Sequence, residues 1–175
     1  MKRLECSEVP FTCPFDLEAY MMLSQTKRIT GELAQRVGTA WDRWRTYLKA
    51  FRLGNRKGYV LVYFESNVED EVDEVWERSP SEGFELQCVA QTMIMLTMGE
   101  VLPELSRTKC APVPEPNKIL KRSLEPLGLA FDKTGGLNVK YGVITAVPLK
   151  QGCEACYLKE SCPKKTLSQE YLKIG

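Results

Sequence analysis

Apolar residues recur at steps of three and four along the first third of the chain. The positions that carry this pattern are Leu17, Tyr20, Met21, Leu23, Ile29, Leu33, Val37, Trp41, Trp44, Leu48 and Phe51. Such spacing places apolar side chains on one side of a helix. The pattern therefore predicts helical structure over residues 14–53, ended by Gly54 and Asn55.

Residues 58–64 form a short run of aromatic and β-branched side chains, which predicts a buried strand. The segment that follows, through residue 78, is rich in acidic side chains and is expected to be a solvated helix or loop. From Pro80 onward apolar residues again fall along one side. Because Pro103 ends this pattern, we expect a further helix over residues 80–102.

Turn-forming residues shape the rest of the chain. Three prolines predict a stiff loop over residues 110–116, with a short helix near 117–124. A Gly-Gly pair between two apolar runs predicts an antiparallel hairpin over residues 129–147. A cysteine-rich loop follows at 152–163, and residues 167–174 predict a last helix. Together these elements indicate an α+β fold, mostly helical, in a single domain (1–175) with a small antiparallel β-hairpin and a Cys-rich C-terminal metal or cluster loop.

Composition narrows the functional classes. The 175 residues are 43% hydrophobic and 27% charged, a balance typical of soluble globular proteins, and the net charge is +1. The chain has no histidine, which excludes serine–histidine triads, cysteine–histidine pairs and histidine-ligated zinc. The first residues do not resemble a signal peptide, and no apolar run is long enough to span a membrane. We therefore expect a cytoplasmic protein without a membrane partner.

The seven cysteines are the strongest chemical signal. An odd number cannot pair completely within one chain, and a reducing compartment favours metal ligation over disulfides. Cys153, Cys156 and Cys162 form a C-x2-C-x5-C array followed by Pro163. Two thiolates separated by two residues can converge on one metal or one cluster edge, and the third closes the loop around it. We therefore expect these three cysteines to ligate one centre.

A tetrahedral zinc site or a [4Fe–4S] cluster needs a fourth thiolate. Cys88 lies among apolar residues of a predicted helix and is expected to be a buried small side chain. Cys6 lies near a terminus that is expected to fray. Cys13, just before the first helix, and Cys110, in a loop, remain as candidates for the fourth ligand.

The array, together with Cys13-Pro14 and with Phe15 and Tyr20 after it, resembles the layout of RecB-family nucleases with an iron staple, a group that includes the CRISPR adaptation nuclease. In that family a Cys-Pro near the N terminus joins a C-terminal C-x2-C-x5-C array around a [4Fe–4S] cluster. The resemblance covers the two ends of the chain. It implies Cys13 as the fourth ligand, with Cys110 as the alternative.

Nucleases of this family need an Asp and an acid-x-Lys motif on adjacent strands to hold a divalent metal. The nearest candidate here is Asp132 with Asn138-Val139-Lys140, in which asparagine replaces the required carboxylate. We therefore expect an iron–sulfur protein without nuclease activity, whose cluster is structural.

Other functions remain open. Zinc bound by cysteines alone would give a structural or interaction protein. A dithiol at Cys153 and Cys156 would be a redox motif, although it leaves Cys162 unexplained. A cluster that itself does redox work would make the chain an enzyme or an electron-transfer component, and an active nuclease would make it an enzyme. Unligated thiols are the last alternative.

Four basic residues, Arg45, Lys49, Arg52 and Arg56, follow one another at steps of four, three and four. On the predicted helix they would form one basic stripe able to follow a phosphate backbone. A solvated face, or ion pairs with the acidic segment, explains the same residues. The sequence thus offers nucleic acid as one candidate partner, beside another protein.

Overall fold

The computed structural model of the chain describes residues 2–105, 110–149 and 155–162. The helices in these residues are α1 (Leu17–Ser24), α2 (Gly31–Trp44), α3 (Ser66–Arg78), α4 (Pro80–Val101) and α5 (Lys118–Leu124), with short 3-10 turns η1 (Arg45–Tyr47) and η2 (Glu125–Leu127). The strands are β1 (Cys6–Glu8), β2 (Leu48–Gly54), β3 (Gly58–Phe64) and β4 (Gly142–Val147). They form one antiparallel sheet in the order β1-β2-β3-β4. The predicted α+β class is confirmed.

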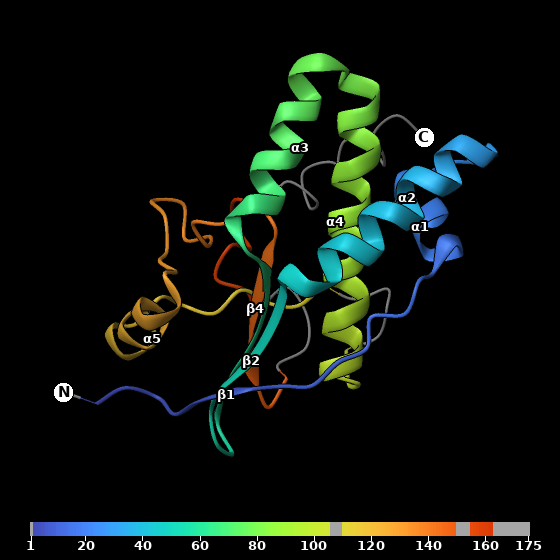
Figure 1. The fold of residues 1–175 in the computed structure, drawn as a ribbon. Coiled ribbons are helices and arrows are strands. Elements are labelled where there is room, and N and C mark those ends of the chain that lie inside the picture. Colours follow the sequence, from blue (N-terminus) through green and yellow to red (C-terminus); the bar gives the residue numbers. More distant parts are fainter. Residues whose placement is uncertain (1, 106–109, 150–154, 163–175) are drawn as a thin grey trace, which may run out of the picture.

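The sheet lies between α4 on one side and α5 on the other (Figure 1), and its two faces belong to two separate apolar cores. α4 packs on one face, with α1, α2 and α3 around it, and Trp41, Trp44 and Met93 are fully buried in this larger core. α5 covers the opposite face, where Leu61 and Leu120 are fully buried. Successive side chains of a strand point to opposite faces. β3 is therefore buried on both sides, which explains its continuous apolar sequence.

The predicted helix over residues 14–53 is wrong beyond Trp44. The chain turns through η1 and continues as β2, which pairs along its whole length with β3. Leu48 and Ala50 of β2 belong to the larger core, whereas Leu53 belongs to the core under α5. Because β2 contributes apolar side chains to both cores, its apolar and polar residues do not alternate strictly. Over so few residues its apolar spacing therefore fits a helix equally well.

The predicted hairpin over residues 129–147 is wrong in its pairing. The turn at Gly135 and Gly136 is present, but a single bridge, between Phe131 and Leu137, joins its two sides within this fully described segment. The later half of the segment is β4, which pairs with β3. β4 completes the sheet because the backbone groups along β3 need partners when both faces of that strand are covered.

α3 and α4 form an antiparallel pair joined by a tight corner at Ser79 (Figure 1). The Ser79 hydroxyl accepts a hydrogen bond from the amide of Glu82 (3.4 Å), and Pro80 occupies the first turn, where no intrahelical amide donor is required. Gly83 permits the close approach of the two helices. A Cβ atom there would lie 2.5 Å from Cγ of Trp76.

Other predicted elements are confirmed. The strand over 58–64 coincides with β3, the helix over 80–102 matches α4 to within one residue, and the short helix near 117–124 is α5. The acidic segment forms α3, whose buried side consists of Val68, Val72 and Val75. The predicted last helix lies outside the described residues. In the part of the chain that the structure describes, no helix has the length and apolar character needed to cross a membrane.

Candidate metal centre

Two cysteines of the array, Cys156 and Cys162, lie in the described residues 155–162, and Cys153 lies outside the described residues. The described part turns back on itself. The amide of Lys159 donates to the carbonyl oxygen of Cys156 (3.2 Å), and the amide of Ser161 donates to that of Leu158 (3.1 Å). Both cysteine side chains are half-buried. The segment thus keeps two of the three cysteines of the array within one short turn.

This segment packs against the proline-rich loop (residues 110–116). The amide of Val113 donates to Sγ of Cys156 (N···S 3.3 Å), and the amide of Tyr157 donates to the carbonyl oxygen of Val113 (2.8 Å). Hydrogen bonds to sulfur are a recurrent feature around metal-bound cysteines, because they offset the negative charge of the thiolate. The sulfur of Cys156 therefore accepts one backbone hydrogen bond of the kind that also occurs around metal-bound cysteines.

The proline-rich loop is itself fixed to the sheet. The buried hydroxyl of Thr145, on β4, donates to the carbonyl oxygen of Pro112 (2.8 Å). Pro112 and Pro114 flank Val113, and each proline ring fixes one backbone dihedral angle. The donor on Val113 is thus presented to Cys156 by a restrained segment.

A turn over residues 132–136 supports the array from another direction. The ring of Tyr157 lies against Gly135, where a Cβ atom would be 2.6 Å from the ring and where φ is +86°. The Asp132 carboxylate accepts hydrogen bonds from the hydroxyl (2.6 Å) and amide (2.8 Å) of Thr134 and from the amide of Gly136 (3.1 Å). These bonds, led by the Thr134 hydroxyl, hold the pKa of Asp132 below its ordinary value. Asp132 therefore acts as a turn-stabilising residue.

Asn138 and Lys140, the other members of the candidate nuclease motif, also have partners in the structure. Oδ1 of Asn138 accepts from the amide of Ala130 (2.9 Å). The Lys140 ammonium group pairs with Asp73 of α3 (2.6 Å), and the Lys140 amide donates to Glu69 of the same helix (3.0 Å). The ion pair spans 67 positions of sequence. No sequence motif could have indicated it.

Cys13 lies in the larger core. Its side chain is 0% exposed, and its Sγ atom lies 3.9 Å from the carbonyl oxygen of Met93. The Cys13 carbonyl accepts from Nε1 of Trp41 (3.0 Å), and its amide donates to the Glu100 carboxylate (3.0 Å). Burial raises the pKa of the Cys13 thiol, whereas metal ligation requires the thiolate. In Figure 1 the blue segment that leads into α1 lies across α4 from the red segment, residues 155–162.

The remaining cysteines occupy three different places. Cys88 is buried in α4, as predicted. Cys6 is exposed but belongs to β1, which pairs with β2, so the expectation of a frayed end is wrong at this residue. Cys110 is exposed at the start of the proline-rich loop and lines a groove of about 370 Å³ between α4 and the start of β4.

The predicted basic stripe is not formed, because its residues do not share a helix. Arg45 is in η1, Lys49 and Arg52 are on β2, and Arg56 is in the turn after it. Residues three positions apart on a strand point to opposite faces, so Lys49 and Arg52 lie on different sides of the sheet. Arg52 donates to the carbonyl oxygen of Asn55 (2.7 Å), which turns it toward the hairpin loop.

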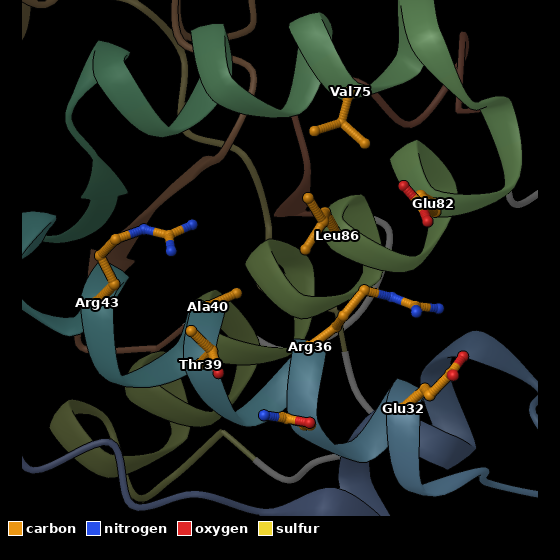
Figure 2. Close-up of a pocket in the computed structure, with 9 residues that line it drawn as sticks. Glu32, Arg36, Thr39, Ala40, Arg43, Val75, Glu82 and Leu86 are labelled. Carbon is orange, nitrogen blue, oxygen red and sulfur yellow. The ribbon is translucent and has the colours of Figure 1, made fainter.

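A second groove, of about 480 Å³, lies between α2, α3 and α4 (Figure 2). Figure 2 shows Val75 and Leu86 facing the space between the helices, with Arg36 and Arg43 on either side. Arg36 pairs with Glu85 of α4 (2.8 Å), and Arg43 pairs with a glutamate of α3. Both guanidinium groups are engaged by carboxylates. These ion pairs link α2 to the helical pair.

Within residues 2–105, 110–149 and 155–162, no group of three or more His, Cys, Asp or Glu side chains is placed to hold a metal ion. Comparison of the chain with protein-family models, with curated proteins and with solved structures gave no match.

Proposed function

We propose that this chain is an iron–sulfur protein in which Cys153, Cys156 and Cys162 ligate one [4Fe–4S] cluster with a structural role. The observation that carries the proposal is the hydrogen bond from the Val113 amide to Sγ of Cys156. In contrast with the thiol of Cys88, which is buried in the larger core, the sulfur of the half-buried Cys156 accepts from a backbone donor. That arrangement suits a ligated thiolate.

The spacing of the array favours a cluster over zinc. C-x2-C-x5-C followed by proline fits cluster loops better than the paired C-x2-C units that commonly hold zinc. The ligands would be deprotonated on binding, and the positive charge of the metal ions would compensate the thiolates. Zinc is the competing occupant of the same ligands, and metal analysis separates the two.

The proposed cluster would fasten two segments that are distant in the sequence. The proline-rich loop connects α4 to α5, whereas the array follows β4 at the edge of the sheet. The described cysteines are not gathered into a ready-made site, so metal binding would complete the folding of the array. Both apolar cores consist of other residues. Loss of the metal should therefore loosen the array and leave the cores folded.

The test uses full-length protein purified without oxygen, together with Cys153→Ala, Cys156→Ala and Cys162→Ala. Cys88→Ala is the matched control, because it also removes one thiol. Iron with an equal amount of sulfide is expected in the parent and control proteins, and each array variant should lose it. Zinc without sulfide would overturn the cluster in favour of the zinc site. A folded protein without metal would overturn both.

Limited proteolysis tests the structural role. The parent protein with its metal should resist cleavage within residues 155–162, and chelation should open this segment while the helical circular dichroism signal persists. Unfolding of the whole chain on chelation, or equal cleavage with and without metal, would contradict the role proposed here. Nucleic-acid binding is not part of the proposal, because the single helical stripe that suggested it is replaced by η1 and β2.

A further inference from the structure

The groove between α2, α3 and α4 has more acidic than basic side chains. Both of its arginines pair with glutamates of the facing helices. Two further carboxylates line the groove, those of Glu32 and Glu82, and neither forms a hydrogen bond or an ion pair with another residue that the structure describes. The pKa of Arg36 is raised, first by its hydrogen bond with Glu85 and then by the nearby charges of Glu82 and Glu32. Three carboxylates therefore surround one guanidinium group, which leaves an excess of negative charge at this end of the groove.

The floor of the same groove is apolar. Val75 of α3 and Leu86 of α4 face the space between the helices in Figure 2, and Ala40 of α2 lines it as well. Leu86 is only half-buried, so part of its side chain contacts water. The groove has a volume of about 480 Å³, which is within the usual range for binding pockets. The groove therefore suits a segment that carries an apolar side chain among basic ones.

α5 presents this combination of side chains. One side of the helix is buried, and the other side carries Ile119, which is 45% exposed, beside the basic residues Lys118, Lys121 and Arg122. Arg122 follows Ile119 by three positions, so these two side chains are neighbours on the helix surface. α5 contains no acidic residue, and none of its basic side chains forms an ion pair with another described residue. The outer face of α5 is thus basic, with one apolar side chain.

We propose that α5 of one copy of this chain docks in the groove between α2, α3 and α4 of a second copy. Ile119 enters the apolar floor, and the basic side chains of α5 meet the carboxylates of Glu32 and Glu82. Charge complementarity selects this occupant, because the groove has carboxylates in excess and α5 has only basic charges. The contact uses no metal and no cysteine, so it is independent of the proposed function.

The two surfaces belong to different copies because of where they lie in the fold. α4, which forms one wall of the groove, packs on one face of the sheet, and α5 covers the opposite face (Figure 1). A contact between two different surfaces is head-to-tail, and each copy keeps one unused surface for the next copy. The assembly should therefore grow beyond two chains as the protein concentration rises.

Sedimentation of the full-length protein in reducing buffer tests the contact. We expect the average mass to rise with protein concentration and to fall as salt is added, because salt screens exposed charges. Ile119→Ser should weaken the association by about 10- to 100-fold, since it removes the apolar side chain that enters the groove. Met22→Ser is the matched control, because Met22 is a more exposed apolar residue (77%) on α1, outside both surfaces.

Reversal of charge tests the carboxylates of the groove. Glu82→Lys should weaken the association by about 10-fold or more, because it places a positive charge opposite the basic face of α5. Glu74→Lys is the control, since Glu74 is exposed on α3 but does not line the groove. Circular dichroism should show the same helix content in both variants. Combining Glu82→Lys with Lys118→Glu should restore part of the association, because the charges of the two surfaces are then exchanged.

A mixture of two variants tests the head-to-tail geometry. Glu82→Lys keeps an intact α5, and Ile119→Ser keeps an intact groove, so the mixture should form a complex of two chains that does not grow further. Growth beyond two chains, or no complex in the mixture, would contradict the inference. Equal effects of the groove variants and their controls would also contradict it. A protein that stays monomeric at every concentration overturns the inference, and binding of a leucine–lysine peptide by that monomer would assign the groove to a different protein.

Discussion

The amide of Val113 donates a hydrogen bond to the Sγ atom of Cys156 across 43 positions of sequence, at an N···S distance of 3.3 Å. This bond joins the proline-rich loop to the cysteine array. It also gives the sulfur the kind of backbone donor that supports metal-bound cysteines. The proposed centre therefore depends on a backbone group as well as on thiols.

Val113→Pro should weaken metal binding without removing a thiol. Proline has no amide hydrogen, so the bond to Cys156 is lost, while the carbonyl that accepts from Tyr157 remains. We expect affinity to fall by about 10- to 100-fold, as measured by competition with a chelator. Val113→Ala keeps the amide and is the control. Equal affinities for the two variants would show that the bond to sulfur does not support the centre.

Glu100→Gln should destabilise the protein in a pH-dependent manner. The carboxylate accepts from the amide (2.6 Å) and hydroxyl (2.8 Å) of Thr12 and from the amide of Cys13 (3.0 Å). Burial by itself would raise the pKa of Glu100, but these hydrogen bonds outweigh it and hold the pKa below its ordinary value of 4.5. At neutral pH the free energy of unfolding of the variant should be lower by about 1 kcal/mol. The value is modest because solvent screens this exposed carboxylate.

The sign of the pH dependence follows from the lowered pKa of Glu100. The stabilisation is complete above the ordinary pKa of 4.5 and is lost as the pH falls through the lower pKa of the folded state. Denaturant unfolding should therefore show a difference in the free energy of unfolding between the parent protein and Glu100→Gln. This difference should shrink as the pH falls below 4.5. A difference that stays constant at acid pH would exclude an ionised Glu100 as the source of the stabilisation.

Gly83→Ala should destabilise the pair formed by α3 and α4. Alanine normally favours a helix interior over glycine by about 1 kcal/mol. At Gly83, however, a Cβ atom would lie 2.5 Å from Cγ and 2.8 Å from Cα of Trp76. We expect the free energy of unfolding to fall by about 1–3 kcal/mol. In Gly99→Ala, on the same helix, the new Cβ meets nothing within 4 Å, so thermal unfolding should show no loss of stability. Equal effects at both positions would contradict the close contact with Trp76.

Tyr141→Phe should preserve stability or increase it. The Tyr141 side chain is 4% exposed, and its hydroxyl has no hydrogen-bond partner within the described residues. Burial, followed by the charges of Asp73 and Glu69, raises the pKa of this phenol, so it stays neutral at physiological pH. Removing an unpaired buried hydroxyl is expected to gain up to about 1 kcal/mol in the free energy of unfolding.

Tyr20→Phe is the control for that measurement. The Tyr20 hydroxyl, also on a buried residue, donates to the carbonyl oxygen of Glu85 (3.4 Å). Removing the Tyr20 hydroxyl should lower the free energy of unfolding by about 0.5 kcal/mol. This is at the low end for a hydrogen bond, because the bond is long. A larger loss from Tyr141→Phe than from Tyr20→Phe would indicate that the Tyr141 hydroxyl has a partner after all.

Sequence patterns located the elements that have local signals. α4 is framed by Ser79-Pro80 and by Pro103, and α5 begins at the capping residue Asn117. β2 could not be assigned in this way, because its residues are divided between two cores that other elements complete. A clue was nevertheless present. The turn from Gly54 to Gly58 separates two apolar runs, as in a β-hairpin.

The candidate site likewise has one part that the sequence predicts and one part that it does not. The array could be found from the sequence because its cysteine spacing is local. Its contact with Val113 could not be found, because every residue except proline carries a backbone amide, so the residue type does not reveal this donor. The two loops also lie far apart in the sequence and meet only in the folded structure. Cys13 shows the converse. Its position before the first helix suggested a ligand, but the structure places its thiol inside the core.

Measurement of iron, acid-labile sulfide and zinc in the full-length protein, purified without oxygen, tests the proposed cluster most directly. Brown protein with equal amounts of iron and sulfide is the expected result. Two results would contradict it. One is colourless protein with one zinc ion per chain. The other is folded, metal-free protein in which Cys153, Cys156 and Cys162 all react with an alkylating reagent.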